Sequence, residues 1–250
     1  VNILGTRVAA VTRQQAADQV LAWAHAADRA YAVGAADVHV IARARHEPDY
    51  GNCINRFDLV LPDGMPLVWN INAEVAESER LHERVSGAEL MCAVFNATNT
   101  SESAGHFLLG GSEKLLADLL QTLKEQYPHA RVAGVYSPPF GTWPDDEWDR
   151  MRSKIAESKA AFVWVGLGCP KQEKWIGEHL SQLPSAVYFA VGAAFAFIAG
   201  HIDRAPSFFQ KNGLEWFYRI CKEPRRLWKR YLVYNSLFIS YWLHDRMKAD

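Results

Sequence analysis

Three segments of this 250-residue sequence follow one pattern, in which an apolar run enters a glycine-containing turn and then a helical or apolar stretch. The run 106–109 leads into Gly110-Gly111-Ser112, 161–165 leads into Gly166-Leu167-Gly168, and 187–191 leads into Gly192. Apolar strands that alternate with helices through short turns are typical of βαβ units, whose strands are parallel. The sequence therefore predicts an α/β fold with a mostly parallel, doubly wound sheet.

Further elements fit the same alternation. Thr12 is a candidate N-cap for an amphipathic helix that reaches Ala27, and the run 57–61 is a candidate buried strand that ends at Pro62-Asp63-Gly64. We also expect a strand within 31–41, a strand at 131–136 and a helix at 145–157.

Composition excludes several classes of protein. Hydrophobic residues make up 49% of the chain and charged residues 22%, which is enough apolar side chain for a large core. The formal net charge of −1 argues against a nucleic-acid-binding protein. No apolar run is long enough to span a membrane, and no signal-peptide pattern opens the sequence. The four cysteines form no CxxC pair and the nine histidines show no ligand-like spacing, so we expect a reducing cytoplasm and no metal site.

The last fifty residues differ from the rest of the chain. They hold 10 Lys or Arg against 5 Asp or Glu, and 11 of the 30 aromatic residues. Within 224–246, apolar residues recur at helical spacing behind a basic cluster; they are Leu227, Tyr231, Tyr234, Phe238 and Tyr241. Such a helix could lie at a membrane surface, or it could pack on the core or on a second copy in a homo-oligomer. We place a boundary near Arg204, which gives a Rossmann-like core at 1–204 and a helical, membrane-proximal appendage at 205–250.

The glycine turns could bind an anion. Gly110-Gly111-Ser112 and 166–170 each precede a helix, whose first N–H groups and dipole favour negative charge, and Ser112 is a candidate N-cap. Glycine also makes tight turns that bind nothing. Neither turn completes GxGxxG, and no GxxxxGK[ST] occurs, so a dinucleotide site or a P-loop has little support. Binding of a diphosphate by several of these turns together remains an open alternative.

Asp63 is the most suggestive carboxylate, because it directly follows a candidate strand. A carboxylate at that place could act as a general base toward an attacking hydroxyl group. Local sequence by itself favours the alternative, a turn residue that hydrogen-bonds its own backbone.

Several motifs occur together in one order along the chain. They are PDGMPLVW (62–69), ERVSGAELM (83–91), FLLGG (107–111), VGLGCPKQEKW (165–175), VGAAFAFIAG (191–200), RAP (204–206) and GLEWFYRICKEPRR (213–226). In this combination the chain resembles the bacterial WecG/TagA/CpsF glycosyltransferase family over nearly its whole length.

The resemblance implies an inverting enzyme that moves a sugar from a UDP-sugar to a polyprenyl-diphosphate-linked sugar for a cell-surface polysaccharide. The donated sugar would be N-acetylmannosamine, or glucose as in xanthan-type relatives, and no metal or other cofactor is expected. The enzyme would be peripheral on the inner face of the cytoplasmic membrane. The family's catalytic base corresponds to Asp63, and the Gln of its PKQE motif corresponds to Gln172. The substrate-binding positions that the resemblance implies are Arg84, Gly110, Gly111, Gly168, Lys171, Glu173, Gly192, Arg204, Arg219, Arg226 and Lys229.

Three positions depart from the family pattern. A TxN-like segment reads Ala35-Ala36-Asp37, a common Gly is Pro66, and a common Asp is Ala196. These changes bear on the identity of the sugar, and they leave room for a non-catalytic subunit of a polysaccharide assembly complex. A nucleotide-dependent oxidoreductase is the other alternative, although the absent GxGxxG disfavours it.

Overall fold

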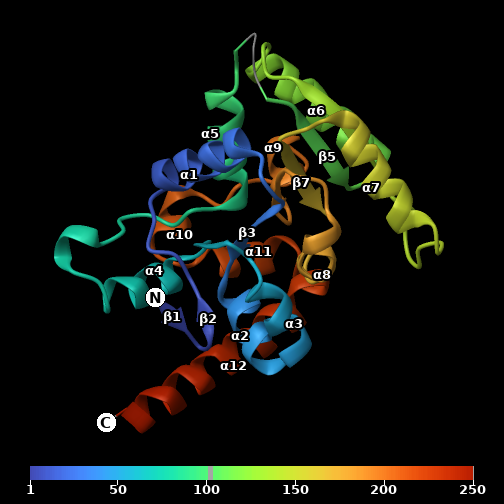
Figure 1. The fold of residues 1–250 in the computed structure, drawn as a ribbon. Helices are drawn as coiled ribbons and strands as arrows, with labels where there is room; N and C mark the ends of the chain where they lie inside the picture. The colour runs from blue at the N-terminus through green and yellow to red at the C-terminus, as the bar shows by residue number, and fades with distance from the viewer. Residues whose placement is uncertain (101–103, 250) are drawn as a thin grey trace.

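The computed structural model describes residues 1–100 and 104–249. Its centre is a sheet of six parallel strands in the order β4-β3-β8-β7-β5-β6 (Figure 1). The strands are β3 (Tyr31–Ala36), β4 (Leu59–Pro62), β5 (His106–Gly110), β6 (Val132–Tyr136), β7 (Phe162–Gly166) and β8 (Val187–Ala190). A short antiparallel hairpin, β1 (Asn2–Ile3) and β2 (Thr6–Arg7), precedes them. The predicted α/β fold with a parallel sheet is confirmed.

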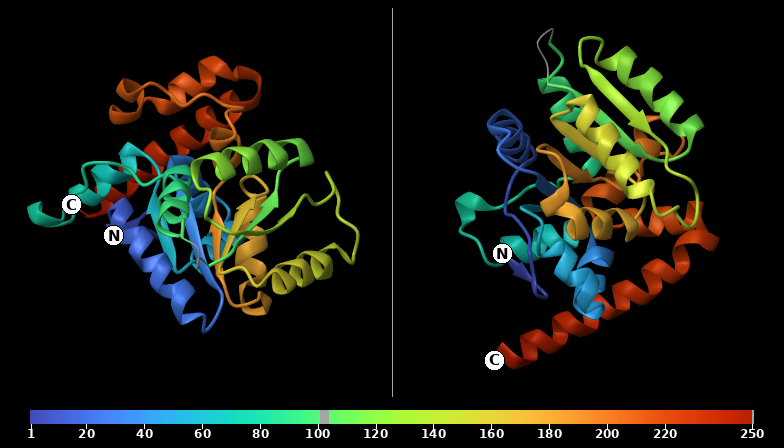
Figure 2. Two further views of the ribbon diagram at one scale, coloured as in Figure 1. Left: turned by 90° about the horizontal axis from the view of Figure 1, so that it is seen from above. Right: turned by 45° about the vertical axis from the view of Figure 1, so that its right-hand side comes forward.

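Helices cover both faces of the sheet, as the end-on view in Figure 2 shows. Successive strand residues alternate between two core clusters: Phe107 and Leu109 pack on one side of the sheet, and Leu108 packs on the other. Before the C-terminal segment the helices are α1 (Arg13–Ala26), α2 (Val38–His46), α3 (Pro48–Ile54), α4 (Met65–Asn72), α5 (Gly87–Ala97), α6 (Glu113–Gln126), α7 (Glu147–Ser158), α8 (Lys171–His179) and α9 (Ala194–Ile198), with single 3₁₀ turns at Glu77–Glu79 and Leu180–Gln182.

Local signals explain where several elements begin. The Thr12 hydroxyl accepts from the backbone N–H of Gln15, and the Gln15 side chain accepts from the N–H of Thr12, so a complete capping box starts α1. Ser112 caps α6 as predicted. The expected strand within 31–41 ends at Ala36, because Asp37 accepts from the N–H of Val40 and starts α2. The strand and the helix thus follow each other within one mostly apolar run, with only Asp37 between them.

The strand order leaves a crevice at one edge of the sheet. After β4 the chain crosses to β5 on the far side of β7 and β8. In open parallel sheets, ligands bind outside the carboxyl ends of the strands, where the connections diverge. The glycine turns and Asp63 all lie at these ends.

The C-terminal segment, residues 205–249, forms α10 (Ser207–Lys211), α11 (Glu215–Lys222) and α12 (Pro224–Ala249). Helix α12 packs along α2, and its C-terminal end extends beyond the rest of the molecule (Figures 1 and 2). The predicted stripe faces the protein: Leu227, Tyr231 and Phe238 are buried, and Tyr234 donates to Glu47 Oε1 at 2.9 Å. Of the two interpretations of this stripe, packing on the core is therefore correct.

Another face of α12 is exposed. It carries Trp228, Leu232, Val233, Leu243 and Met247. In the described ranges 1–100 and 104–249, no helix combines the length and the apolar character needed to cross a membrane.

Candidate active site

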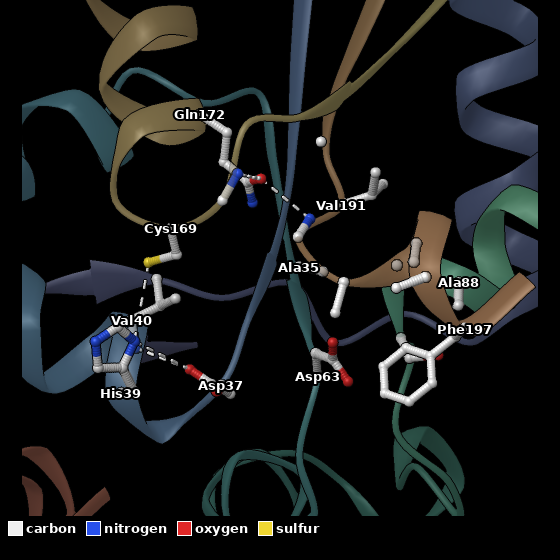
Figure 3. Close-up of a pocket in the computed structure, with 18 of the residues that line it drawn as sticks. Ala35, Asp37, His39, Val40, Asp63, Ala88, Cys169, Gln172, Val191 and Phe197 are labelled. Atoms are coloured by element: carbon white, nitrogen blue, oxygen red, sulfur yellow. Dashed lines mark hydrogen bonds and ion pairs between the residues drawn. The ribbon is translucent and has the colours of Figure 1, made fainter. Parts of the chain in front are cut away.

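A cavity of about 1400 Å³ lies at the carboxyl ends of the strands. The turns after β3, β4, β5, β7 and β8 form its floor. The C-terminal segment closes one side with Gln210, Glu215, Arg219, Leu227 and Tyr231. Figure 3 shows residues from these separate turns facing one another across it. The sheet and the C-terminal segment together make one site.

Asp63 stands at the end of β4, where its backbone N–H donates to the carbonyl of Ala36 at 2.8 Å. Its carboxylate points into the cavity (Figure 3) and accepts from Arg84 Nη1 at 2.6 Å. About a quarter (26%) of the Asp63 side chain is exposed, and the rest is enclosed by protein. This partial burial disfavours the charged carboxylate and raises the pKa of Asp63 to about 6. The Arg84 charge lowers this pKa, and the charges of Glu215 and Asp37 raise it. A carboxylate with this pKa is suited to accept a proton near neutral pH.

Arg84 precedes α5 and joins the core to the C-terminal segment. Its Nη2 lies 2.8 Å from Glu215 Oε2 and 3.2 Å from Gln210 Oε1. Two carboxylates therefore surround one guanidinium, which is mostly buried. Arg84 lines the cavity as the sequence predicted, and in this geometry it fixes the position of Asp63.

Gln172 lies in the first turn of α8 and is almost fully buried. Its Oε1 accepts from the backbone N–H groups of Gly168 and Gly192, both at 3.1 Å, and its Nε2 donates to Glu173 Oε1 at 2.8 Å. One side-chain amide thus ties the turn after β7 to the turn after β8. Gln172 and Glu173 line the cavity, and the contacts of Gln172 make it a residue that shapes the two turns.

The two glycines after β5 have different surroundings. Gly111 lines the cavity, whereas Gly110 is not among the lining residues. Gly110 has φ +107°, and a Cβ there would lie 2.7 Å from the backbone of Gly166. Gly110 therefore allows the turns after β5 and β7 to pack closely.

Three of the predicted cationic residues line the cavity. Lys171 Nζ lies 3.7 Å from the ring centroid of Trp143, and burial lowers the pKa of this amine. Arg204 Nη1 lies 3.6 Å from Glu89 Oε1. Arg219 has a buried Nε to which no described residue offers an acceptor. The side chains of Arg226 and Lys229 lie outside the described part of the chain, although both residues belong to α12.

A cluster that the sequence did not predict lies beside Asp63. His39 is buried, and its Nδ1 lies 3.9 Å from Asp37 Oδ1 and 3.8 Å from Cys169 Sγ. His39 and Cys169 are 130 residues apart in sequence, and the fold brings the start of α2, after β3, to the turn after β7, although β8 lies between these two strands. The one available signal was that Asp37 and Cys169 each closely follow a strand.

The departures from the family pattern also reach the cavity. Ala35, Asp37, Pro66 and Ala196 all line it. Among the described residues, no group of three or more His, Cys, Asp or Glu side chains has an arrangement that could hold a metal ion.

Comparison with known proteins shows the family of this chain. The family model "Glycosyl transferase WecG/TagA/CpsF family" matches residues 1–250. The chain is 30% identical over 206 residues to an N-acetylglucosaminyldiphosphoundecaprenol N-acetyl-beta-D-mannosaminyltransferase of Bacillus spizizenii, covering 82% of this chain and 76% of the relative. It is 29% identical over 184 residues to the protein of the same name from Bacillus subtilis, covering 74% and 68%. This chain therefore belongs to the WecG/TagA/CpsF family of glycosyltransferases.

Proposed function

We propose that this protein transfers a sugar from a UDP-sugar to a sugar linked to polyprenyl diphosphate, with inversion at the anomeric carbon and with Asp63 as the general base. The position of Asp63 carries the proposal: its carboxylate points into the cavity with a pKa of about 6. The names of the two relatives support the substrate class, because both specify an undecaprenyl-diphosphate-linked acceptor and a mannosaminyl group.

The reaction follows from where Asp63 stands. Asp63 accepts the proton of the acceptor hydroxyl group as that oxygen forms a bond to the anomeric carbon of the donor. The bond from the anomeric carbon to the diphosphate breaks at the same time, and UDP leaves with the bonding electrons. Arg84 holds the carboxylate at 2.6 Å, so little reorganisation is required when the acceptor arrives.

Negative charge accumulates on the diphosphate as UDP leaves. Lys171, Arg204 and Arg219 line the cavity and supply positive charge, and Arg219 Nε has an available N–H. Backbone N–H groups at the starts of α6 and α8 add to this field. We expect these groups to neutralise the leaving group without a metal ion, and we expect Arg226 and Lys229 to contribute as the family resemblance implies.

The same proposal places the enzyme at the inner face of the cytoplasmic membrane, where a polyprenyl acceptor is confined. The exposed apolar residues of α12, which include Trp228 and Leu232, suit a peripheral attachment. No membrane span is needed for that role.

Transfer assays with purified protein test the proposal. UDP-N-acetylmannosamine, UDP-glucose, UDP-N-acetylglucosamine and UDP-galactose are each incubated with N-acetylglucosamine diphosphate carrying a short polyprenyl chain. We expect one donor to yield UDP and a disaccharide product with inverted anomeric configuration. The relatives favour N-acetylmannosamine, whereas Ala35 and Ala196 bear on a change of sugar. Absence of transfer from all four donors, with UDP binding intact, would contradict the proposal and favour a non-catalytic role.

A further inference from the structure

A second cavity, of about 370 Å³, lies between α4 and α12. Helix α4 contributes Pro66, Trp69 and Asn70, spaced so that they share one face. Helix α12 contributes Phe238 and Trp242, which are four residues apart, and Ile239; Arg246 lies one turn beyond Trp242. We call this cavity the aromatic groove. Its volume is in the range of about 300–1,000 Å³ that is usual for pockets that hold small ligands.

The aromatic groove continues the candidate active site. Pro66, Phe238 and Ile239 line both cavities. Helix α4 begins at Met65, two residues after Asp63, so the groove starts beside the proposed base. Whatever occupies the groove therefore has its inner end close to the proposed base.

The groove offers a largely apolar surface. Trp242 Nε1 donates to Asn70 Oδ1 at 2.7 Å, and Asn70 Nδ2 donates to the carbonyl of Pro66 at 2.7 Å. These two bonds engage the Trp242 indole and the Asn70 amide within the wall itself. Trp69 remains 52% exposed and Ile239 57% exposed. Large apolar side chains left exposed in a concave surface are typical of a binding site for an apolar group.

Charge changes along the groove. Its inner end meets the cavity that holds Lys171, Arg204 and Arg219. At its outer end the Arg246 guanidinium lies 4.0 Å from the Trp242 ring centroid, and exposed Lys248 follows on the projecting end of α12 (Figure 2). The same cavity also holds Arg84 and the carboxylates Asp37, Asp63, Glu173 and Glu215, so the order is charged with both signs, then apolar, then basic. A molecule with a diphosphate and a hydrocarbon chain matches the first two zones, and an anionic membrane surface matches the third.

We propose that the aromatic groove binds the first isoprenoid units of the polyprenyl-diphosphate acceptor. This inference rests on the proposed function, in which the acceptor consists of a sugar, a diphosphate and a hydrocarbon chain in that order. With the sugar at Asp63 and the acceptor diphosphate next to it at the inner end of the groove, the chain leaves between α4 and α12 toward the membrane. A nucleotide suits this groove less well than a hydrocarbon chain, because most of the groove's lining residues are apolar.

Direct binding tests the groove without relying on catalysis. Dissociation constants for farnesyl diphosphate and for inorganic diphosphate are measured by titration calorimetry on the full chain. We expect the wild type to bind farnesyl diphosphate at least about tenfold more tightly, a gain comparable to that from one buried aromatic anchor. Trp69→Ala should remove that preference and leave the affinity for inorganic diphosphate unchanged. Trp69→Phe should retain most of the preference, which separates loss of contact from loss of fold.

Phe208 provides a control. It is 63% exposed on α10 and lines neither cavity, so Phe208→Ala should bind both ligands like the wild type. Equal binding of farnesyl diphosphate by wild type and Trp69→Ala would overturn the groove assignment. Loss of the preference in Trp69→Ala, together with no sugar transfer to any acceptor by the wild type, would support the groove and contradict the proposed function.

Discussion

Asp63 Oδ1 lies 2.6 Å from Arg84 Nη1, and the other terminal nitrogen of the same guanidinium lies 2.8 Å from Glu215 Oε2. Asp63 ends a strand of the sheet, and Glu215 begins α11 in the C-terminal segment. The proposed base is therefore held by a cation that also anchors the segment closing the cavity. Any movement of α11 would change the charge around Asp63.

Replacing Asp63 by Asn tests its role as the general base. Asp63→Asn keeps the shape of the side chain and removes its ability to accept a proton. We expect turnover to fall by about 10²–10⁴-fold, the usual contribution of a general base. The affinity for UDP, measured by calorimetry, should stay close to that of the wild type because Asp63 acts on the acceptor.

Asp118→Asn is the control for that substitution. Asp118 is a partly exposed carboxylate that pairs with His201 at 2.7 Å and does not line the cavity. Its variant should keep wild-type turnover. Near wild-type turnover in Asp63→Asn would remove Asp63 from the mechanism.

The pH dependence of transfer should report the same carboxylate. Burial raises the pKa of Asp63 to about 6, and the base works only when ionised, so kcat/KM should rise with pH through about 6 and then level off. Arg84→Gln removes the charge that lowers this pKa and should move the midpoint to higher pH. Asp37→Asn removes a charge that raises it and should move the midpoint to lower pH, while Asn still caps α2. Shifts in the same direction, or none, would assign the titration to another group.

Gln172 should matter for stability as well as for activity. Gln172→Ala deprives the N–H groups of Gly168 and Gly192 of their acceptor. Both N–H groups line the cavity and Gly168 is exposed, so water can replace part of the lost bonding, and we expect the free energy of unfolding in urea to fall by about 1–3 kcal/mol. Gln121→Ala, on the outer face of α6, should change it by less than about 0.5 kcal/mol. A stable Gln172→Ala variant would show that the two turns do not depend on this amide.

Chelation tests the role given to the cavity cations. Lys171, Arg204 and Arg219 are expected to neutralise the diphosphate, so transfer in excess EDTA should proceed at the rate seen with added magnesium. Initial rates of UDP release in the two buffers measure this. A loss of activity in EDTA that magnesium restores would require a metal ion in the mechanism.

The sequence alone predicted much of the local structure. The apolar runs and glycine turns located β5, β7 and β8, Thr12 and Ser112 marked two helix starts, and helical spacing predicted α12. These features depend on neighbours within a few residues, so composition and spacing record them. The short hairpin and the helices α2, α3, α4, α5, α9, α10 and α11 were missed. All of these helices except α5 have fewer than ten residues, which is too short to show a clear period.

The site was predicted less completely. The sequence predicted that Asp63 follows a strand, and the family motifs indicated Arg84, Gln172 and Arg219. The sequence did not predict the contacts within the site, because the residues in contact are far apart in the chain: Arg84 is 126 residues from Gln210, and His39 is 130 residues from Cys169. Such contacts depend on the order in which strands pair, which no local pattern specifies.

Helix α12 shows most clearly which features the sequence determines and which depend on the tertiary structure. Its sequence determined that it is helical and that one face is apolar, because side chains three and four positions apart share a face. Whether that face meets lipid or protein depended on what lay opposite. Only the tertiary structure placed α2 against it and left the groove beside α4, because the fold brings together surfaces that are distant in sequence.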